Sequence, residues 1–434
     1  MDFARVLYTA AGSALLPLLP LRLWWRGRRE PGYRRAWGER FGRYGAVPPA
    51  SVVWWVHAVS VGETRAALPL LQHLRRAYPD IAIVLTHMTA TGRETGRALY
   101  GDTVTQVWLP YDLPFAVDAF LEHFRPAAGF LLETELWPNL IARAAARRIP
   151  VYLVNARLSE RSAAGYRRFG ALTRPMLSRL AGVAAQSAAD EARLAALGAR
   201  KTVVTGNLKF DVMVPDAARA LGAEFALRFG STRLVWIAAS TREGEEALLL
   251  DALERAPLSP ESLLVIVPRH PQRFAAVADL LRQRGIRFAR RSDNGPVPAD
   301  ARVVLGDSMG ELFAYYAAAD LAFVGGSLLP LGGQNLIEPL AFGIPVLIGP
   351  HTYNFAEASA GAVSAGAAEI VADADALAAS ARAILSDPAR RQAMSAAARA
   401  FHAAHRGAAD RLWSWLAPQL KDAAAAALKR ADRD

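Results

Sequence analysis

From residue 52 onward, short β-rich runs alternate with helix-length segments, and this alternation restricts the fold more than any other feature of the sequence. Strands that alternate with helices predict βαβ units and a parallel sheet. The first half contains seven such runs, at residues 52–58, 81–88, 104–110, 127–133, 151–155, 182–186 and 202–205. After a pause without a strong strand, further runs follow at residues 234–239, 263–267, 302–305, 321–324 and 345–348.

The pause at residues 209–231 divides the chain, and its length of 434 residues is typical of two or three domains. We predict an α/β fold with two Rossmann-like domains facing a cleft, preceded by an N-terminal membrane anchor helix. Ligands of open α/β sheets bind beyond the carboxyl ends of the strands, so the chemistry is expected there. The predicted parts are an anchor (1–26), a first domain (27–208), a linker (209–232), a second domain (233–400) and a C-terminal helix and tail (401–434) that is expected to pack on the first domain.

The amino terminus contains an uncharged apolar run over residues 6–21, which Arg22 interrupts and residues 23–25 resume. A membrane-spanning helix needs about 20 apolar residues, so this run is marginal. Pro17 and Pro20 would kink a helix at this place. The prediction is an uncleaved signal-anchor, with its depth in the bilayer left open.

A basic block follows, with eight arginines and two glutamates between residues 22 and 43. Such a block beside an apolar segment indicates the cytoplasmic side and attracts anionic lipid head groups. A cleaved signal peptide is a weaker alternative because only Arg5 precedes the apolar run, and a buried helix of a soluble domain is another. The net charge of +11 also favours acidic partners, and the lack of cysteine excludes disulfides and thiolate metal sites.

The first strand is followed by HAVSVGETRAA (57–67), in which Ser60 and Glu63 have the spacing of a capping box. This structural role is a serious alternative, because the spacing recurs at 240–243 and 308–311. A carboxylate at a helix amino terminus is expected to be kept ionised by the helix dipole. An ionised carboxylate at a strand end can take the proton of an attacking hydroxyl, which makes Glu63 a candidate general base.

Two acids, Glu133 and Glu135, close an apolar strand in ETELWPNL (133–140), where an unpaired carboxylate is costly. Arg157 and Arg161 in NARLSERS are candidate anion contacts, or else the ion-pair partners of those acids. Lys209 in GNLKFD falls where the first domain ends, and a lysine there can hold a phosphate or lie in solvent.

The second domain has glycine-rich turns after its strands, in GDSMGEL (306–312) and GGSLLPLGGQN (325–335). Glycines before a helix let backbone N–H groups approach a phosphate, with the helix dipole behind them. VPRHPQRF (267–274) places Arg269 at the same edge, and Glu338 is a candidate for ribose hydroxyls. These features predict a nucleotide site.

Taken together, HAVSVGE, ETELWPNL, NARLSERS, GNLKFD, PRHP, SMGEL and GGSLLPLGGQNLIEP resemble the Kdo transferases of lipid A biosynthesis. That family moves 3-deoxy-D-manno-oct-2-ulosonic acid (Kdo) from CMP-Kdo to a lipid A precursor. The resemblance implies a GT-B fold with an acceptor domain followed by a CMP-sugar donor domain. It also implies inversion at the sugar, a glucosamine disaccharide (lipid IVA) acceptor in lipopolysaccharide core biosynthesis, and no cofactor or obligate metal.

Residue by residue, the resemblance implies that Glu63 is the general base and that Glu133 and Lys209 stabilise the transition state. The implied CMP contacts are Pro268, Arg269, Met309, Gly310, Glu311, Asn335, Leu336, Ile337 and Glu338. The expected partners are CMP-Kdo, a lipid A precursor and anionic membrane lipid, but not nucleic acid. The expected location is the inner (cytoplasmic) membrane, with the catalytic domains facing the cytoplasm.

Three rivals remain open. Another GT-B nucleotide-sugar transferase or epimerase would share the architecture. A nicotinamide oxidoreductase would need G-x-G-x-x-G after a strand, and neither half of the chain begins that way. A lipid- or nucleic-acid-binding protein would explain the positive charge, although the basic block lies beside the anchor. A metal-dependent transferase would use D-x-D, and the pair Asp373 and Asp375 is instead expected to cap a helix.

Overall fold

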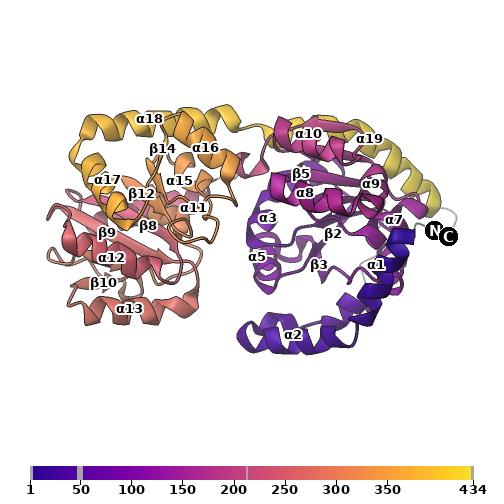
Figure 1. Ribbon diagram of the computed structural model, residues 1–434, viewed down its shortest axis with the longest axis horizontal. Coiled ribbons are helices and arrows are strands. Elements are labelled where there is room, and N and C mark those ends of the chain that lie inside the picture. The colour runs from indigo at the N-terminus through magenta and orange to yellow at the C-terminus, as the bar shows by residue number, and fades with distance from the viewer. Residues whose placement is uncertain (1–2, 46–51, 212–213, 432–434) are drawn as a thin grey trace. The chain divides into compact units, whose positions relative to one another are not determined.

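The computed structural model describes residues 3–45, 52–211 and 214–431. Contacts divide the chain into two compact units, which we call unit 1 (1–212 with 406–434) and unit 2 (213–405). Each unit contains one parallel seven-stranded sheet with helices packed on it (Figure 1). The chain is therefore an α/β protein with two Rossmann-like units, as the alternation of strands and helices predicts.

The sheet of unit 1 has the strand order β3-β2-β1-β4-β5-β6-β7, and every neighbouring pair is parallel. All seven strands predicted for the first half are present. Their bounds are β1 (Val53–His57), β2 (Ala82–His87), β3 (Thr105–Trp108), β4 (Ala128–Leu132), β5 (Val151–Ala156), β6 (Gly182–Ala185) and β7 (Thr202–Val204).

Helices connect these strands and cover both faces of the sheet, as parallel pairing requires. The α-helices of unit 1 after the amino terminus are α3 (Val61–Ala66), α4 (Leu68–Ala77), α5 (Ala90–Tyr100), α6 (Pro114–Phe124), α7 (Pro138–Ala146), α8 (Glu160–Arg168), α9 (Gly170–Ser178), α10 (Ala188–Ala196) and α19 (Ala408–Ala431). Its 3-10 turns are η1 (Pro31–Arg34), η2 (Trp37–Phe41), η3 (Gly101–Thr103) and η4 (Leu208–Asp211).

The sheet of unit 2 has the order β10-β11-β9-β8-β12-β13-β14 and is also parallel. Two of its strands, the three-residue edge strands β10 and β14, are absent from the sequence prediction. The bounds are β8 (Leu234–Thr241), β9 (Ser262–Pro268), β10 (Phe288–Arg290), β11 (Val303–Leu305), β12 (Leu321–Val324), β13 (Val346–Ile348) and β14 (Ala368–Ile370).

One helix of unit 2, α11 (Asp216–Phe229), lies within the segment that the sequence assigns to a linker. Phe225 and Phe229 of α11 are buried in the core of unit 2, so most of this segment is part of a domain. The other helices are α12 (Glu245–Arg255), α13 (Phe274–Gln283), α14 (Leu312–Ala317), α15 (Ile337–Ala341), α16 (Ala356–Ser364), α17 (Ala374–Ser386) and α18 (Pro388–His405), with 3-10 turns η5 (Pro271–Arg273) and η6 (Arg291–Asp293).

The amino terminus forms two short helices, α1 (Phe3–Ala14) and α2 (Leu18–Arg29), where the sequence predicts one anchor helix. Within the described ranges, no single helix is long and apolar enough to cross a membrane. Together α1 and α2 meet that length and composition, but they are bent by 60°. The bend falls at Pro17, which precedes the first residue of α2 and cannot donate a helical hydrogen bond. A membrane role for this pair stays a prediction.

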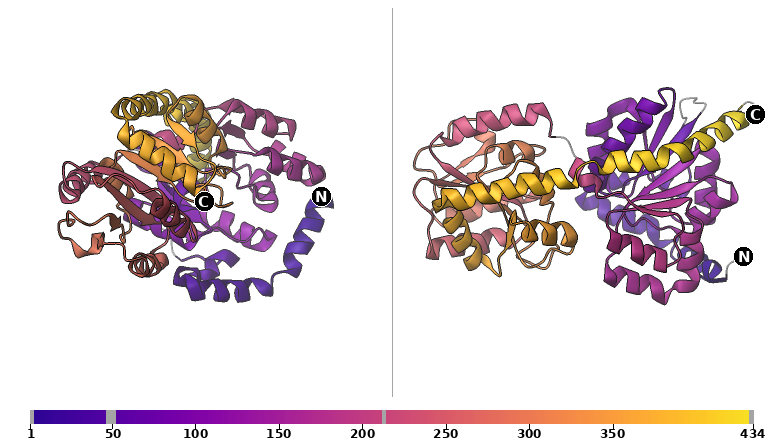
Figure 2. Two further views of the ribbon diagram at one scale, coloured as in Figure 1. Left: turned by 60° about the vertical axis from the view of Figure 1, so that its left-hand side comes forward. Right: turned by 90° about the horizontal axis from the view of Figure 1, so that it is seen from above.

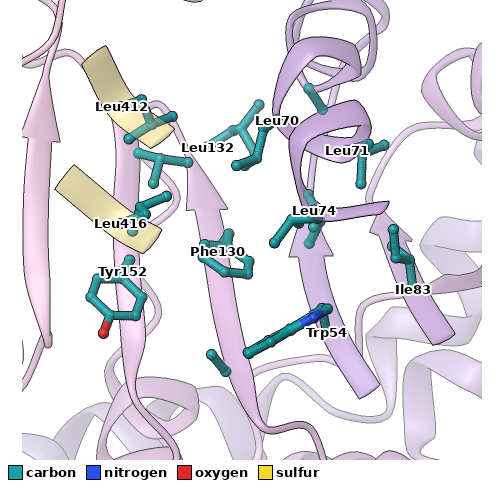
Figure 3. Packing of buried hydrophobic residues seen from close by; sticks show 14 of the residues in the cluster. Trp54, Leu70, Leu71, Leu74, Ile83, Phe130, Leu132, Tyr152, Leu412 and Leu416 are labelled. Carbon is teal, nitrogen blue, oxygen red and sulfur yellow. The ribbon is translucent and has the colours of Figure 1, made fainter. Parts of the chain in front are cut away.

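The C-terminal helix α19 completes the core of unit 1, as the sequence predicts for the tail. The predicted start at residue 401 is too early, because residues 401–405 belong to α18 of unit 2. The helix α19 lies across the strands of the unit 1 sheet (Figure 2). Leu412, Leu416 and Leu420 are fully buried and belong to the core cluster that includes residues of α4 and of the sheet. Figure 3 shows Leu412 and Leu416 in this cluster. Full burial of a leucine is worth about 1.5–3 kcal/mol, so the three together contribute a substantial share of the stability of unit 1.

Candidate functional site

Glu63 lies in the first turn of α3, directly after β1, and its side chain is buried. The Ser60 hydroxyl donates to its Oε1 at 2.8 Å, and the Val59 N–H donates to its Oε2 at 2.8 Å. In return, the Ser60 oxygen accepts from the Glu63 N–H. The capping interaction predicted from the S-x-x-E spacing is therefore present, and it fixes the carboxylate at the carboxyl edge of the sheet.

The pKa of Glu63 is raised to about 7, mainly by burial and in addition by the negative charges of Glu133 and Glu135. The hydrogen bonds from Val59 and Ser60 act in the opposite direction. The expectation that the helix dipole keeps this carboxylate at an ordinary low pKa is therefore wrong, because desolvation dominates. A carboxylate whose pKa lies near neutrality is well matched to general base catalysis at that pH.

Glu133 follows β4 directly and has a φ of 57°, in the left-handed region that is strained for a residue with a Cβ. Its N–H still donates to the Val154 carbonyl at 3.0 Å, so the sheet hydrogen bonding continues to this residue. Such backbone strain persists where the surrounding structure over-determines it, and it gathers at functional sites. The turn directs the carboxylate to Lys209, whose Nζ lies 2.5 Å from Oε1 of Glu133.

Lys209 lies in η4, and hydrogen bonds at the beginning and at the end of this turn fix its position. The N–H of Leu208 donates to Oδ1 of Asn155 at 2.9 Å, and the N–H of Lys209 donates to Oδ1 of Asn207 at 3.0 Å. Beyond them, Asp211 accepts from two N–H groups at the start of α19. The three residues predicted to be catalytic thus meet in unit 1, since the Glu133 charge acts on Glu63 and Lys209 pairs with Glu133.

Glu135 has a different set of partners from those considered in the sequence. The Trp137 indole N–H donates to its Oε2 at 3.0 Å, and Nε2 of the fully buried His57 lies 3.6 Å from the same oxygen. Sequence reasoning missed His57, because the pattern gives no sign that this end of β1 lies beside the loop after β4. The end of β1 thus lies beside the loop that carries both acids.

In unit 2, the loop after β12 is organised by Glu245, a fully buried carboxylate that sequence reasoning missed. Its two oxygens accept from the N–H groups of Gly326, Ser327 and Leu328 at 2.6–3.0 Å, and also from that of Arg242 at 2.9 Å. An internal carboxylate therefore takes these three N–H groups. For the other N–H groups of the glycine-rich turns, contact with a phosphate stays a prediction.

Pro268 is the last residue of β9, and Arg269 follows it. The Arg269 Nε donates to Oε1 of Gln334 at 3.3 Å, which ties the end of β9 to the loop before α15. In that loop, Asn335 accepts from the N–H of Ile337 at 3.1 Å. The other predicted contacts of this stretch divide by exposure: Leu336 and Ile337 are buried, while Glu338 is half-buried.

The remaining predicted contacts lie before α14. Met309 is exposed, and Gly310 has a φ of 83° with open space where a Cβ would stand. Glu311 pairs with Arg291 at 2.9 Å and also accepts from the Ser308 hydroxyl. Arg291 is a further residue that the sequence did not single out, and it ties η6 to this turn.

The Asp373 and Asp375 pair is a helix cap, as predicted. Asp373 accepts from the N–H of Ala376 at 2.8 Å, and Asp375 forms a hydrogen-bonded ion pair with Arg255. Their carboxylates therefore have structural partners.

Comparison with known proteins gives two family matches. Residues 35–212 match the family described as 3-deoxy-D-manno-octulosonic-acid transferase (kdotransferase), and residues 282–401 match glycosyl transferases group 1. A 3-deoxy-D-manno-octulosonic acid transferase of Bordetella pertussis is 46% identical over 430 residues, covering 95% of this chain and 99% of the relative. The protein of that name in Haemophilus influenzae is 41% identical over 427 residues, covering 96% and 99%.

Among solved structures, a UDP-GlcNAc 2-epimerase from Neisseria meningitidis bound to UDP-GlcNAc superposes with a TM-score of 0.56. It is 17% identical and covers 79% of this chain and 94% of its own. At this identity the likeness concerns the fold, which is a GT-B-like pair of α/β units.

Proposed function

Because the chain belongs to the 3-deoxy-D-manno-octulosonic acid transferase family, we propose that it moves Kdo from CMP-Kdo to the glucosamine disaccharide of a lipid A precursor. It is a glycosyltransferase, and two relatives of that name share nearly its whole length at more than 40% identity. An epimerase activity is not favoured, because the epimerase likeness extends only to the fold.

The buried carboxylate of Glu63 is the observation that carries the mechanism. A sugar hydroxyl is a poor nucleophile until a base takes its proton. As the acceptor oxygen forms its bond to the anomeric carbon of Kdo, the proton passes to Glu63. The bond between that carbon and the phosphate oxygen breaks on the opposite face, so that CMP leaves and the configuration inverts.

The Glu133–Lys209 pair supplies opposite charges beside this base. In the transition state the sugar ring gains positive charge and the departing phosphate gains negative charge. A carboxylate and an ammonium held in fixed positions stabilise such charges without reorganisation at the moment of reaction. We assign Glu133 to the developing positive charge and Lys209 to the anionic groups of the donor.

The donor site is assigned to unit 2, at the loops after β9, β11 and β12. The N–H groups of residues 326–328 already bind Glu245. We therefore assign the nucleotide contacts to the turn at Gly310 and to the first residues of α15. Arg269 is the cation suited to the CMP phosphate, and Glu338 is suited to the ribose hydroxyls. No bound metal is part of this assignment.

Membrane association is assigned to α1 and α2 at the cytoplasmic face of the inner membrane. Exposed apolar side chains are Phe3 and Leu7 of α1, Leu15 of the turn after it, and Trp24 and Trp25 of α2. Tryptophans of this kind favour the membrane interface, and arginines beside them attract anionic lipid.

The test is transfer from CMP-Kdo to a tetra-acylated lipid A precursor in detergent, followed by mass spectrometry, with EDTA in a parallel reaction. We expect a gain of one or more Kdo masses that EDTA leaves unchanged. Absence of product from folded enzyme would overturn the proposed reaction, and loss of product with EDTA alone would overturn the metal-independent mechanism.

A further inference from the structure

A pocket of about 580 Å³ opens beside α2, and none of the residues assigned to catalysis lines it. Its walls are apolar apart from one arginine, and its volume lies within the ~300–1,000 Å³ that is typical of ligand sites. The residues that line it are Pro17, Pro20, Leu21, Leu23, Trp24, Tyr33, Arg34 and Trp37. We call it the α2 groove.

The α2 groove is built by side chains that are held in place. Tyr33 is buried and stacks on Trp108, with ring centroids 6.0 Å apart. The guanidinium carbon of Arg28 lies 4.8 Å from the centroid of the Trp24 ring. Arg34 donates a hydrogen bond to the Trp24 carbonyl at 3.1 Å. These contacts fix the Tyr33 ring and hold the Trp24 ring, which are two of the aromatic walls.

Arg34 lines this apolar pocket, and Arg28 lies over the ring of Trp24, which forms part of the wall. Arg22 and Arg35 are close to them in the sequence. Arg22, Arg28, Arg34 and Arg35 are exposed and form no ion pair with a carboxylate of the described residues. A long apolar chain would remove water from the walls, while anionic groups at its head would meet guanidinium groups that are not neutralised by a described carboxylate. The matching ligand is a phosphorylated lipid.

The α2 groove is connected to the candidate base by a short series of contacts within unit 1. A Cβ at Gly32, which adjoins Tyr33, would meet the Ala90 side chain at the start of α5. Thr89, the cap of α5, donates to the Val59 carbonyl at 2.6 Å, and the Val59 N–H donates to Glu63. The groove and the candidate base Glu63 are therefore parts of the same unit, so one acceptor molecule can contact both.

We infer that the α2 groove binds one acyl chain of the acceptor lipid, whose phosphates contact the arginines of residues 22–35. This inference rests on the proposed function and adds a specificity site to it. The groove would raise the affinity for an acylated disaccharide over the same disaccharide without acyl chains, while leaving the chemical step at Glu63 unchanged.

Two leucines of α2 provide a matched test. Leu21 lines the groove and Leu18 does not, yet both belong to the same helix and are 62% and 56% exposed. Leu21→Asn and Leu18→Asn therefore remove similar apolar surface from any membrane or micelle contact. Trp37→Ser, in η2, is a second groove variant from a different element.

Kinetics would be measured with the tetra-acylated disaccharide bisphosphate and with the deacylated, water-soluble form. We expect Leu21→Asn and Trp37→Ser to raise KM for the acylated acceptor at least fivefold at unchanged kcat. Leu18→Asn should change KM less than twofold, and all three variants should match the wild type with the deacylated acceptor.

Equal effects of Leu21→Asn and Leu18→Asn on the acylated acceptor would overturn the inference, because the helix would then act only as a general lipid contact. A loss with the deacylated acceptor as large as with the acylated one would also overturn it. Failure of the wild-type protein to transfer Kdo at all is a different result, which would contradict the proposed function itself.

Discussion

The ammonium of Lys209 lies 2.5 Å from Oε1 of Glu133, although the two residues are 76 positions apart in the chain and their side chains are only 13% and 12% exposed. Glu133 reaches this contact from a strained turn after β4, and Lys209 reaches it from a 3-10 turn tied to Asn155. Two remote segments thus place opposite charges beside Glu63. The pair is expected to affect stability and catalysis in separable ways.

Removing either partner leaves the other charge poorly solvated, which costs ~3–5 kcal/mol for a fully buried pair. For this slightly exposed pair we expect Lys209→Met and Glu133→Gln each to lower the free energy of unfolding of unit 1 by about 2–3 kcal/mol. The double variant should recover most of that loss while remaining inactive. Urea unfolding combined with a transfer assay separates the two effects, and a double variant as unstable as the sum of the single ones would contradict the coupling.

The pH dependence of transfer should reflect Glu63, since the base must be ionised to accept a proton. With its pKa raised to about 7, kcat should rise with pH through neutrality. Part of that shift comes from the charge of Glu133, so Glu133→Gln should move the rising limb to lower pH while lowering the rate itself. Glu135→Gln is the graded control, because Glu135 is a smaller cause of the shift and should move the limb less. A limb that stays in place in both variants would show that another group titrates.

The free energy of unfolding should also depend on pH through Glu63. Its contribution should fall as pH rises, whereas that of an ion-paired carboxylate rises. The pKa of Glu63 is raised from its ordinary value of 4.5, so between about pH 4.5 and 7 the folded chain keeps a proton that the unfolded chain has lost. The contribution of Glu63 therefore falls as pH rises across this window and stays low above it. Glu63→Gln should lose transfer while retaining CMP binding. Its unfolding free energy relative to wild type should increase from pH 5 to pH 8, and a constant difference would contradict the raised pKa.

The sequence predicts the order of the strands along the chain well, because each inner strand is a buried apolar run bounded by turn residues. The strands β10 and β14 escape prediction because they are only three residues long and lie at sheet edges, where burial is partial. The sequence assigns the helix α11 to a linker because its segment contains no strong strand, although Phe225 and Phe229 have the i, i+4 spacing of one helix face. That this face packs into the core of unit 2 is visible only in the fold.

In the candidate site, too, some residues can be predicted from the sequence and others cannot. Glu63, Glu133 and Lys209 are predictable because each stands next to the end of a predicted strand. Glu245 is not, because its role is to accept hydrogen bonds from a loop 81 or more residues later in the chain. The pKa of Glu63 is also beyond local reasoning, since its main cause is burial by segments that the sequence does not place together.

Glu245 gives a sharp test of how unit 2 holds its glycine-rich loop. A glutamine at this position has only one oxygen that accepts hydrogen bonds. Its NH2 group would face backbone N–H groups, which are also donors. Leaving buried N–H groups unpaired costs ~1–3 kcal/mol each, so Glu245→Gln should destabilise unit 2 by at least 2 kcal/mol and weaken CMP binding. Glu243→Gln, two residues earlier with an 84% exposed side chain, is the matched control and should behave as wild type. Thermal unfolding and CMP titration provide the readout, and similar behaviour of the two variants would refute the structural role of Glu245.

Leu416 tests whether the C-terminal helix is part of the first domain's core or an appendage. Its side chain is fully buried among residues of the unit 1 sheet and of α4, so truncation leaves a cavity. Leu416→Ala should lower the unfolding free energy of unit 1 by about 2–5 kcal/mol. Leu227→Ala, at a 77% exposed leucine of another helix, should stay within about 0.5 kcal/mol of wild type. Because the damage lies in unit 1, CMP binding by unit 2 should persist at temperatures where Leu416→Ala has lost transfer. Simultaneous loss of both activities would mean that the two units unfold as one.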